Sequence, residues 1–330
     1  MSDAALAGTA EDAWRAPWQG RVDAADGAAG HRWHQIVRPW QPGLPAGVAL
    51  LGLASDEGVR RNQGRAGAAE GPDALRRALA PLPAGEGLDL LDAGTVVCAE
   101  EQLEAAQADY AARAACLLQE GHLVIGLGGG HEIAWASYQA LVADLRQRPS
   151  QRLAIVNFDA HFDLRADPRP TSGTPFLQAL QHARQHHLPV DYRVLGISRT
   201  ANTRALFDAA SAWGVQWTVD EEMTLLHLDR LQRELAGWLR GYDAVYLSLC
   251  LDVLPASVAP GVSAPAARGV PQEVLEPLVQ TVAGCGLLRL ADVAELCPRL
   301  DADQRTARTA ARLLWQVVES HRDAARKGRA

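Results

Sequence analysis

Residues 153–163 read LAIVNFDAHFD, a short apolar run that passes directly into acidic and imidazole side chains. The run shows no polar alternation, which is typical of a strand buried on both faces of a parallel sheet. Asp159, His161 and Asp163 occupy alternate positions at its end, and all three are residue types that bind metal ions. The stretch therefore predicts a buried parallel strand that ends in a chemically active cluster.

The same rhythm of strand and helix continues along most of the chain. We expect further strands at 47–53, 88–94, 122–129, 192–198, 245–252 and 288–296, and helices at 71–82, 100–121, 131–147 and roughly 304–321. Alternating strands and helices predict an α/β fold, a three-layer αβα sandwich with a mainly parallel central sheet.

The chain divides most simply into an extension and one domain. Residues 1–45 are rich in Gly, Pro, Ala and Trp with weak periodicity, so we expect an N-terminal arm or cap over the core. Residues 46–330 contain no internal repeat and no low-complexity linker, and their length suits a single large α/β domain.

Composition narrows the possible partners and surroundings. The net charge of −7 argues against nucleic acid and against anionic membrane surfaces. The five cysteines lack CxxC spacing, and the first residues lack an apolar signal-peptide core, so we expect a cytoplasmic protein with reduced thiols. No uninterrupted apolar run is long enough to predict a membrane-spanning helix.

Two further strands lead into residues that carry chemistry. GLGGGHE (126–132) contains His131, and SLCLD (248–252) ends at Asp252. Ligands in open parallel sheets bind outside the carboxyl ends of the strands, where these ends meet. We therefore expect His131 and Asp252 to join the side chains of 159–163 in one cluster.

This combination of two imidazoles and three carboxylates suits a divalent ion such as Mn²⁺, Zn²⁺, Ni²⁺ or Fe²⁺. It offers more donors than a three-ligand catalytic zinc site requires, and it suits two metals that share a hydroxide. The glycine-rich run at 126–130 could instead form a phosphate loop, but no GK[ST] follows it. The cluster predicts a two-metal hydrolytic centre.

Taken together, these motifs resemble the arginase/agmatinase ureohydrolase family. The resemblance rests on GGGHE (128–132), DAHFD (159–163) and SLCLD (248–252), and it spans roughly residues 47–320. It implies an arginase-like fold, a cofactor of two Mn²⁺ per subunit, hydrolysis of a guanidino or amidino carbon–nitrogen bond, and a homo-oligomer. The metal ligands that it implies are His131, Asp159, His161, Asp163, Cys250 and Asp252.

One of these positions departs from the family pattern. The family motif Ser-x-Asp-x-Asp reads SLCLD here, so Cys250 replaces an aspartate that bridges the metals. Cys250 points to the same side of its strand as Asp252. A thiolate can bind metal ions, but it is softer than a carboxylate and cannot bridge in the same bidentate way. Two interpretations of Cys250 therefore stand side by side: it binds a metal ion, or it is simply a small buried residue in a core strand.

Finer features resemble the formimidoylglutamase branch of the family. They lie at 56–79, 159–165, 172–176, 254–265 and 291–313. This resemblance implies hydrolysis of N-formimidoyl-L-glutamate to L-glutamate and formamide, a step of histidine degradation. Phe176 stands where arginases carry a proton-transferring histidine, which argues against an arginase.

The resemblance also implies roles for individual residues. A dicarboxylate amidine substrate needs guanidinium partners, for which Arg165 and then Arg65 are the first candidates, followed by Arg60 and Arg61. Ser172 and Gly173 belong to a substrate loop. The catalytic candidates are Asp163, which would pass the proton of the nucleophile to the leaving amine, and His161. For Glu295 we expect a supporting or structural role.

Two other functions stay open on the sequence alone. The chain could be a guanidino-acid hydrolase or an agmatinase-like enzyme, although agmatine would favour acidic residues over arginines around the site. It could also be a metal-poor homologue without enzymatic activity, because Cys250 replaces a bridging carboxylate.

Overall fold

Strand β5 (Leu153–Phe158) is buried along its whole length, as its apolar run predicts. Its side chains alternate between two hydrophobic cores, with Val156 and Phe158 in one and Ile155 in the other. Both faces of the sheet are therefore covered, as expected for parallel strands. The computed structural model describes residues 14–145 and 151–327.

Within these residues, nine strands form one sheet in which every neighbouring pair is parallel. Their order is β1-β3-β2-β4-β9-β8-β5-β6-β7. The other strands are β1 (Arg38–Pro39), β2 (Val48–Ala54), β3 (Leu90–Val97), β4 (Leu123–Gly128), β6 (Val190–Ile197), β7 (Gln216–Val219), β8 (Ala244–Cys250) and β9 (Leu288–Ala294).

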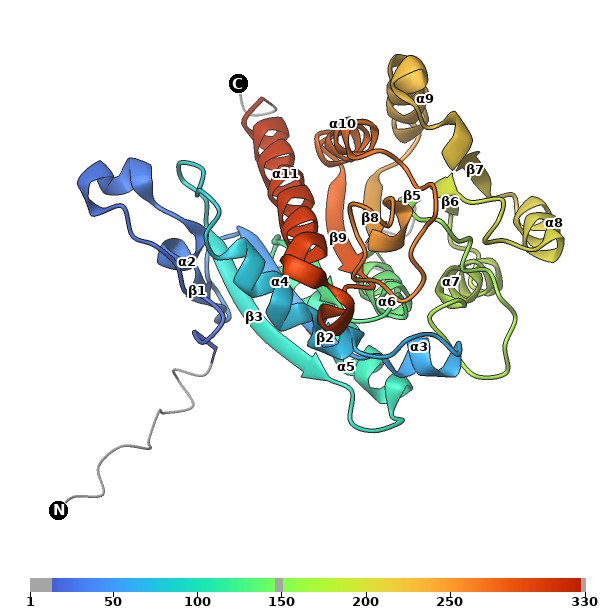
Figure 1. The fold of residues 1–330 in the computed structure, drawn as a ribbon, viewed down its shortest axis with the longest axis horizontal. Helices are drawn as coiled ribbons and strands as arrows, with labels where there is room; N and C mark the ends of the chain where they lie inside the picture. The colour runs from blue at the N-terminus through green and yellow to red at the C-terminus, as the bar shows by residue number, and fades with distance from the viewer. Residues whose placement is uncertain (1–13, 146–150, 328–330) are drawn as a thin grey trace.

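Helices cover both faces of this sheet (Figure 1). One face packs against α4 (Gly71–Leu79), α9 (Leu228–Leu239), α10 (Gln272–Ala283) and α11 (Arg305–Lys327). The other packs against α5 (Leu103–Gln119), α6 (Ile133–Leu145), α7 (Pro175–Gln185) and α8 (Arg204–Ala212). The short helices α2 (Trp33–Ile36) and α3 (Glu57–Arg61) lie in connections. The predicted three-layer αβα sandwich is confirmed.

The observed elements differ from the sequence prediction mainly in the second half. Strand β7 and helices α7–α10 were not anticipated; β7 has only four residues, half of them exposed at the sheet edge. Strand β3 begins and ends later than the expected 88–94, and α11 continues past 321 to Lys327. Residues 146 and 147 of the expected helix lie outside the described residues.

The N-terminal region is joined to the sheet rather than laid only over it. Strand β1 extends the sheet beside β3, and Trp18 donates a hydrogen bond from Nε1 to Asp92 Oδ2 at 2.7 Å. Trp33 is completely buried in the core. In Figure 1 this region lies beside β3, on the opposite side of the molecule from α7 and α8. The division of the chain at 45/46 stays a prediction, and residues 1–13 lie outside the described part.

Across residues 14–145 and 151–327, none of the helices combines the length and the apolar character needed to cross a membrane.

Candidate metal centre and active site

The three strand ends identified in the sequence meet at one edge of the sheet. Strands β4, β9, β8 and β5 are consecutive neighbours, and Phe158 pairs with Leu249. Asp159 therefore follows β5 directly beside Cys250, the last residue of β8. The carboxyl ends of these parallel strands form the floor of the site, as the topology requires.

Two groups of candidate metal ligands share Asp159. One consists of His131, Asp159 and Cys250, and the other of Asp159, His161 and Asp252. Within each group, one ligand atom from every residue lies within 4.8 Å of the others. A carboxylate common to two donor groups is the arrangement that a pair of closely spaced divalent ions requires.

Close backbone packing places His131 in this cluster. A Cβ atom at Gly129 would collide with the carbonyl oxygen of Ser55, so the run before His131 needs glycine. The side chain of His131 is then held from behind. Its Nε2 lies 2.9 Å from Ser248 Oγ, and Ser248 donates to Asp292 Oδ1 at 2.6 Å. Because the Ser248 hydroxyl donates its proton to Asp292, Nε2 of His131 carries a hydrogen, and Nδ1 is the ring nitrogen that faces the site.

The two histidines contact different carboxylates. His131 Nδ1 lies 3.0 Å from Asp159 Oδ2 and 2.8 Å from Asp163 Oδ2. His161 Nδ1 lies 3.0 Å from Asp252 Oδ2 and 3.5 Å from Asp159 Oδ1. Asp163 reaches the cluster with a left-handed backbone, φ 49°, a conformation that Asp tolerates better than most residues. Asp159 is thus the centre of the cluster.

The geometry of the donor atoms fits bound cations. His131 Nδ1 and Asp252 Oδ1 are both buried and make no hydrogen bond within the described residues. The carboxylates near His131 Nδ1 are close enough, but those contacts lack hydrogen-bond geometry. Buried polar atoms are rarely left without a partner, and a metal ion between them would supply one.

Burial opposes negative charge throughout this cluster. Burial, and then the charge of Asp159, raise the pKa of Asp163 to about 6. Burial and the same carboxylate raise the pKa of the Cys250 thiol well above its ordinary range. For Asp159, burial raises the pKa, but the contacts with the imidazoles of His131 and His161 outweigh burial and lower it. A divalent cation would favour the charged carboxylates and a thiolate, reversing the effect on Cys250.

A cavity of about 330 Å³ opens above the cluster. Its lining includes most of the site residues proposed from the sequence, together with side chains that the sequence did not reveal. The proposed residues in its wall are His131, His161, Asp163, Cys250, Asp252, Arg65, Arg165 and Ser172, and the additional ones include Asn62, Gln63, Asn202 and Ser263. Asp159 is completely buried beneath the cavity, and Gly173 accepts a hydrogen bond from Arg165 N at 2.9 Å.

The two candidate substrate arginines differ in their surroundings. Arg65 donates from Nε to Ser263 O at 2.8 Å and from Nη2 to Val262 O at 2.6 Å, so its guanidinium holds a neighbouring loop. Arg165 is exposed at the cavity, and its guanidinium makes no hydrogen bond or ion pair with the described residues. Arg165 is therefore the cation available to a ligand.

Two other residues of the sequence prediction are buried against His131. Glu295 Oε1 accepts a hydrogen bond from His131 N at 2.9 Å, which agrees with a supporting role, and Glu295 also faces the cavity. The ring of Phe176 meets the His131 imidazole edge to face, with centroids 5.4 Å apart, and stacks on Tyr192. An aromatic ring thus packs the position where arginases carry a histidine.

Comparison with known proteins agrees with this fold. The Arginase family model matches residues 46–319, which covers most of the chain, and the chain belongs to the arginase family. Among curated relatives, it is 55% identical over 306 residues to a formimidoylglutamase of Ralstonia nicotianae, covering 92% of this chain and 94% of that one. It is 50% identical over 313 residues to a formimidoylglutamase of Aromatoleum aromaticum, covering 92% of each.

Solved structures show the same fold. A formimidoylglutamase from Bacillus subtilis superimposes with a TM-score of 0.78 at 23% identity, covering 88% of this chain and 91% of that one. A Trypanosoma cruzi formiminoglutamase with two Mn²⁺ superimposes with a TM-score of 0.72 at 25% identity, covering 83% and 93%.

Proposed function

We propose that this chain hydrolyses N-formimidoyl-L-glutamate to L-glutamate and formamide, a step of histidine degradation. The observation that carries the proposal is the arrangement of one cavity. Its floor holds two donor groups that share Asp159, and its wall presents the unpaired guanidinium of Arg165. The two curated relatives described above, at least 50% identical over most of the chain, carry the name formimidoylglutamase.

We propose Mn²⁺ as the cofactor, with two ions per subunit. His131, Asp159, Asp163 and Cys250 would hold one ion, and Asp159, His161 and Asp252 the other. When bound, two divalent ions lower the pKa of a shared water and so supply a hydroxide nucleophile near neutral pH. A homo-oligomer is proposed on family resemblance alone.

The residues of the chain would orient the reactants and move one proton. Asp163 lines the cavity and is held by its contact with His131, so it can accept the proton of the nucleophile and deliver it to the leaving amine. His161 lies across the floor beside Asp252 and would fix the second half of the donor set. Hydrolysis then breaks the carbon–nitrogen bond and releases glutamate.

Charge complementarity would select the substrate. The carboxylates of formimidoylglutamate would pair with the guanidinium of Arg165, beside Ser172 and Gly173. Arg65 would be a second, less available cation. The amidine end would lie over the floor of the cavity, where Glu295 lines the wall beside the proposed metal ligands. Agmatine has no carboxylate, so it would leave Arg165 without a partner and is disfavoured by this cavity.

The test is glutamate release from N-formimidoyl-L-glutamate by protein reconstituted with Mn²⁺, with chelator-treated protein as the control. Release that depends on the metal supports the proposal. Urea release from guanidino acids or agmatine, without glutamate release, would replace it with the agmatinase-like alternative. Inactivity toward all of these substrates in a folded, metal-loaded protein would overturn the proposal: either Cys250 has disabled the site, or the protein is not a hydrolase.

A further inference from the structure

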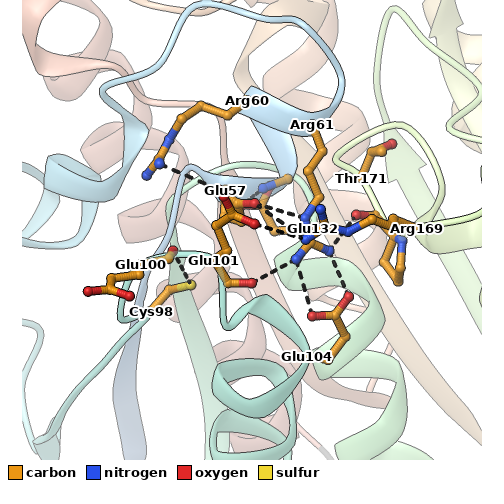
Figure 2. A network of polar contacts seen from close by, with 12 residues as sticks. Glu57, Arg60, Arg61, Cys98, Glu100, Glu101, Glu104, Glu132, Arg169 and Thr171 are labelled. Atoms are coloured by element: carbon orange, nitrogen blue, oxygen red, sulfur yellow. Dashed lines mark hydrogen bonds and ion pairs between the residues drawn. The ribbon is translucent and has the colours of Figure 1, made fainter.

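An arginine whose side chain is almost fully covered connects three chain segments (Figure 2). Arg61 is the last residue of α3, and its side chain is only 7% exposed. Its Nε donates to Glu57 Oε1 at 2.9 Å, within the same helix. Its Nη1 and Nη2 donate to the two carboxylate oxygens of Glu104, at 2.7 and 3.2 Å. Nη1 also donates to Pro170 O at 3.0 Å, and Nη2 to Glu101 O at 2.8 Å.

These contacts use all five N–H groups of the guanidinium. A lysine at the same position would offer three donors from a single nitrogen, which cannot reach carboxylates and carbonyls on three sides. A simple surface ion pair would contribute little and would tolerate lysine. The geometry at Arg61 therefore requires arginine specifically.

The contact with Pro170 fixes the wall of the cavity. Pro170 lies in residues 165–173, the segment that carries both Arg165 and Ser172. Helix α3 and the residue that follows it, Asn62, hold the same segment at two more points: Ser172 N donates to Gly58 O at 3.0 Å, and Asn62 Nδ2 donates to Ser172 Oγ at 3.3 Å. A side chain of this segment, Arg169, also lies 3.5 Å from Glu101 Oε2.

The opposite side of α3 is fixed to the metal-ligand cluster. Gly58 N donates to Glu132 Oε1 at 3.0 Å, and Ser55 Oγ donates to the same oxygen at 2.8 Å. A Cβ atom at Gly58 would lie 2.6 Å from Glu132 Cδ, so the Glu132 side chain packs directly against the Gly58 backbone. Glu132 directly follows His131. Helix α3 thus contacts both Glu132, the residue after His131, and the 165–173 wall of the cavity.

We propose that Arg61 is a positioning residue, which holds the 165–173 segment against α3 so that Arg165 and Ser172 face the substrate. This inference rests on the proposed function, because it gives the segment its role in binding a carboxylate substrate. Arg61 itself does not line the cavity and does not touch the substrate.

The test compares Arg61→Lys with the wild type in turnover, metal content and hydrogen–deuterium exchange. We expect the KM for N-formimidoyl-L-glutamate to rise about tenfold or more while kcat changes by less than about threefold, since a loosened wall weakens binding more than chemistry. Amides of residues 166–174 should exchange faster, and Mn²⁺ content should be unchanged.

Two further variants keep the test interpretable. Arg113→Lys replaces an exposed arginine that pairs with Asp109 on the surface of α5, and it should leave KM and exchange as in the wild type. Glu104→Gln keeps a hydrogen-bond acceptor for Arg61 but removes its charge on an exposed side chain, so it should raise KM less. If Arg61→Lys fails to fold, Glu104→Gln still tests the contact between Arg61 and Glu104.

Several outcomes would overturn the proposal. The first is an unchanged KM in Arg61→Lys, and the second is unchanged hydrogen–deuterium exchange in residues 166–174. The third is a fall of both kcat and Mn²⁺ content at constant KM, which would assign Arg61 to the metal centre. A wild type that does not release glutamate overturns the proposed function and the role in binding with it. In that case the exchange data still decide whether Arg61 holds the segment.

Discussion

His131 and Ser248 lie on different strand ends, and the 2.9 Å between Nε2 and Oγ fixes which imidazole nitrogen faces the candidate metal site. Ser248 donates onward to Asp292, whose carboxylate also accepts hydrogen bonds from Ser137 and Tyr246, each at 2.6 Å. Burial raises the pKa of Asp292, and these three hydrogen bonds oppose that effect. The orientation of His131 is therefore set by a buried polar chain behind it.

Removing this support should weaken metal binding without removing a ligand. In Ser248→Ala, His131 loses the acceptor for its Nε2 hydrogen, and we expect Mn²⁺ affinity to fall about 10- to 100-fold. Calorimetric titration of the metal-free protein measures it. Ser211→Ala is the matched control, because the Ser211 hydroxyl bonds only to Phe207 O on an exposed part of α8. Equal Mn²⁺ affinity in the two variants would contradict the role of the chain.

The floor of the site could be predicted from the sequence because its residues directly follow buried strands. The apolar runs of β5 and β8 are visible as sequence, and parallel pairing brings Asp159 and Asp252 to the same edge. Strand β7 was missed for the opposite reason. It is short, and Trp217 is 37% exposed on an edge strand, so its pattern carries no burial signal.

The walls of the cavity could not be predicted in the same way, because their contacts join distant segments. Arg65, which we expect to bind a carboxylate, also donates to the carbonyl of Ser263, 198 residues away along the chain. Asn202 belongs to no recognisable sequence motif. In the structure its Nδ2 donates to Ala160 O and Ser198 O, both at 2.8 Å, and so holds the turn between two metal-ligand candidates. Only the fold reveals such partners.

The donor group of His131, Asp159 and Cys250 has its third ligand only if the Cys250 sulfur binds the metal. If its sulfur is a ligand, Cys250→Ala should lower the affinity for one Mn²⁺ by about tenfold or more, which is about 1.4 kcal/mol or more of binding free energy. Cys250→Asp restores the carboxylate of the family motif and should retain or raise that affinity, because Mn²⁺ prefers oxygen donors to sulfur. Metal content per subunit and calorimetric titration measure both changes.

A spectroscopic control separates ligation from packing at this position. In protein loaded with Co²⁺, a bound thiolate gives sulfur-to-metal charge-transfer absorption, which Cys250→Ser should shift or weaken. Cys250 is 2% exposed, so a purely structural role predicts lower stability for Cys250→Ala with no change in metal content. That combination of results, with no thiolate absorption in the wild type, would exclude Cys250 as a ligand.

Arg165 should determine substrate affinity. Arg165→Met removes the unpaired guanidinium, and we expect KM for N-formimidoyl-L-glutamate to rise about 10- to 100-fold, since one charge-assisted pair contributes about 1.5–3 kcal/mol. Arg165→Lys keeps the charge without the bidentate geometry and should have an intermediate effect. Arg199→Met is the control, because Arg199 is exposed and lies 3.6 Å from Glu221. A fall of kcat at unchanged KM would assign Arg165 a different role.

Removal of the metal should destabilise the folded protein. Asp159, Asp163 and Asp252 converge within a buried cluster, and without cations their mutual repulsion and burial oppose folding. A ligand at about 100 times its Kd stabilises the native state by about 2.7 kcal/mol. In a chain of this size such a change shifts Tm by at least a few degrees. We expect chelation to lower Tm by this amount and excess Mn²⁺ to restore it, measured by calorimetry.

Ser248→Ala, with its weaker binding, should need more Mn²⁺ for the same recovery of Tm. Identical melting of chelated and Mn²⁺-loaded protein would show that the cluster holds no metal.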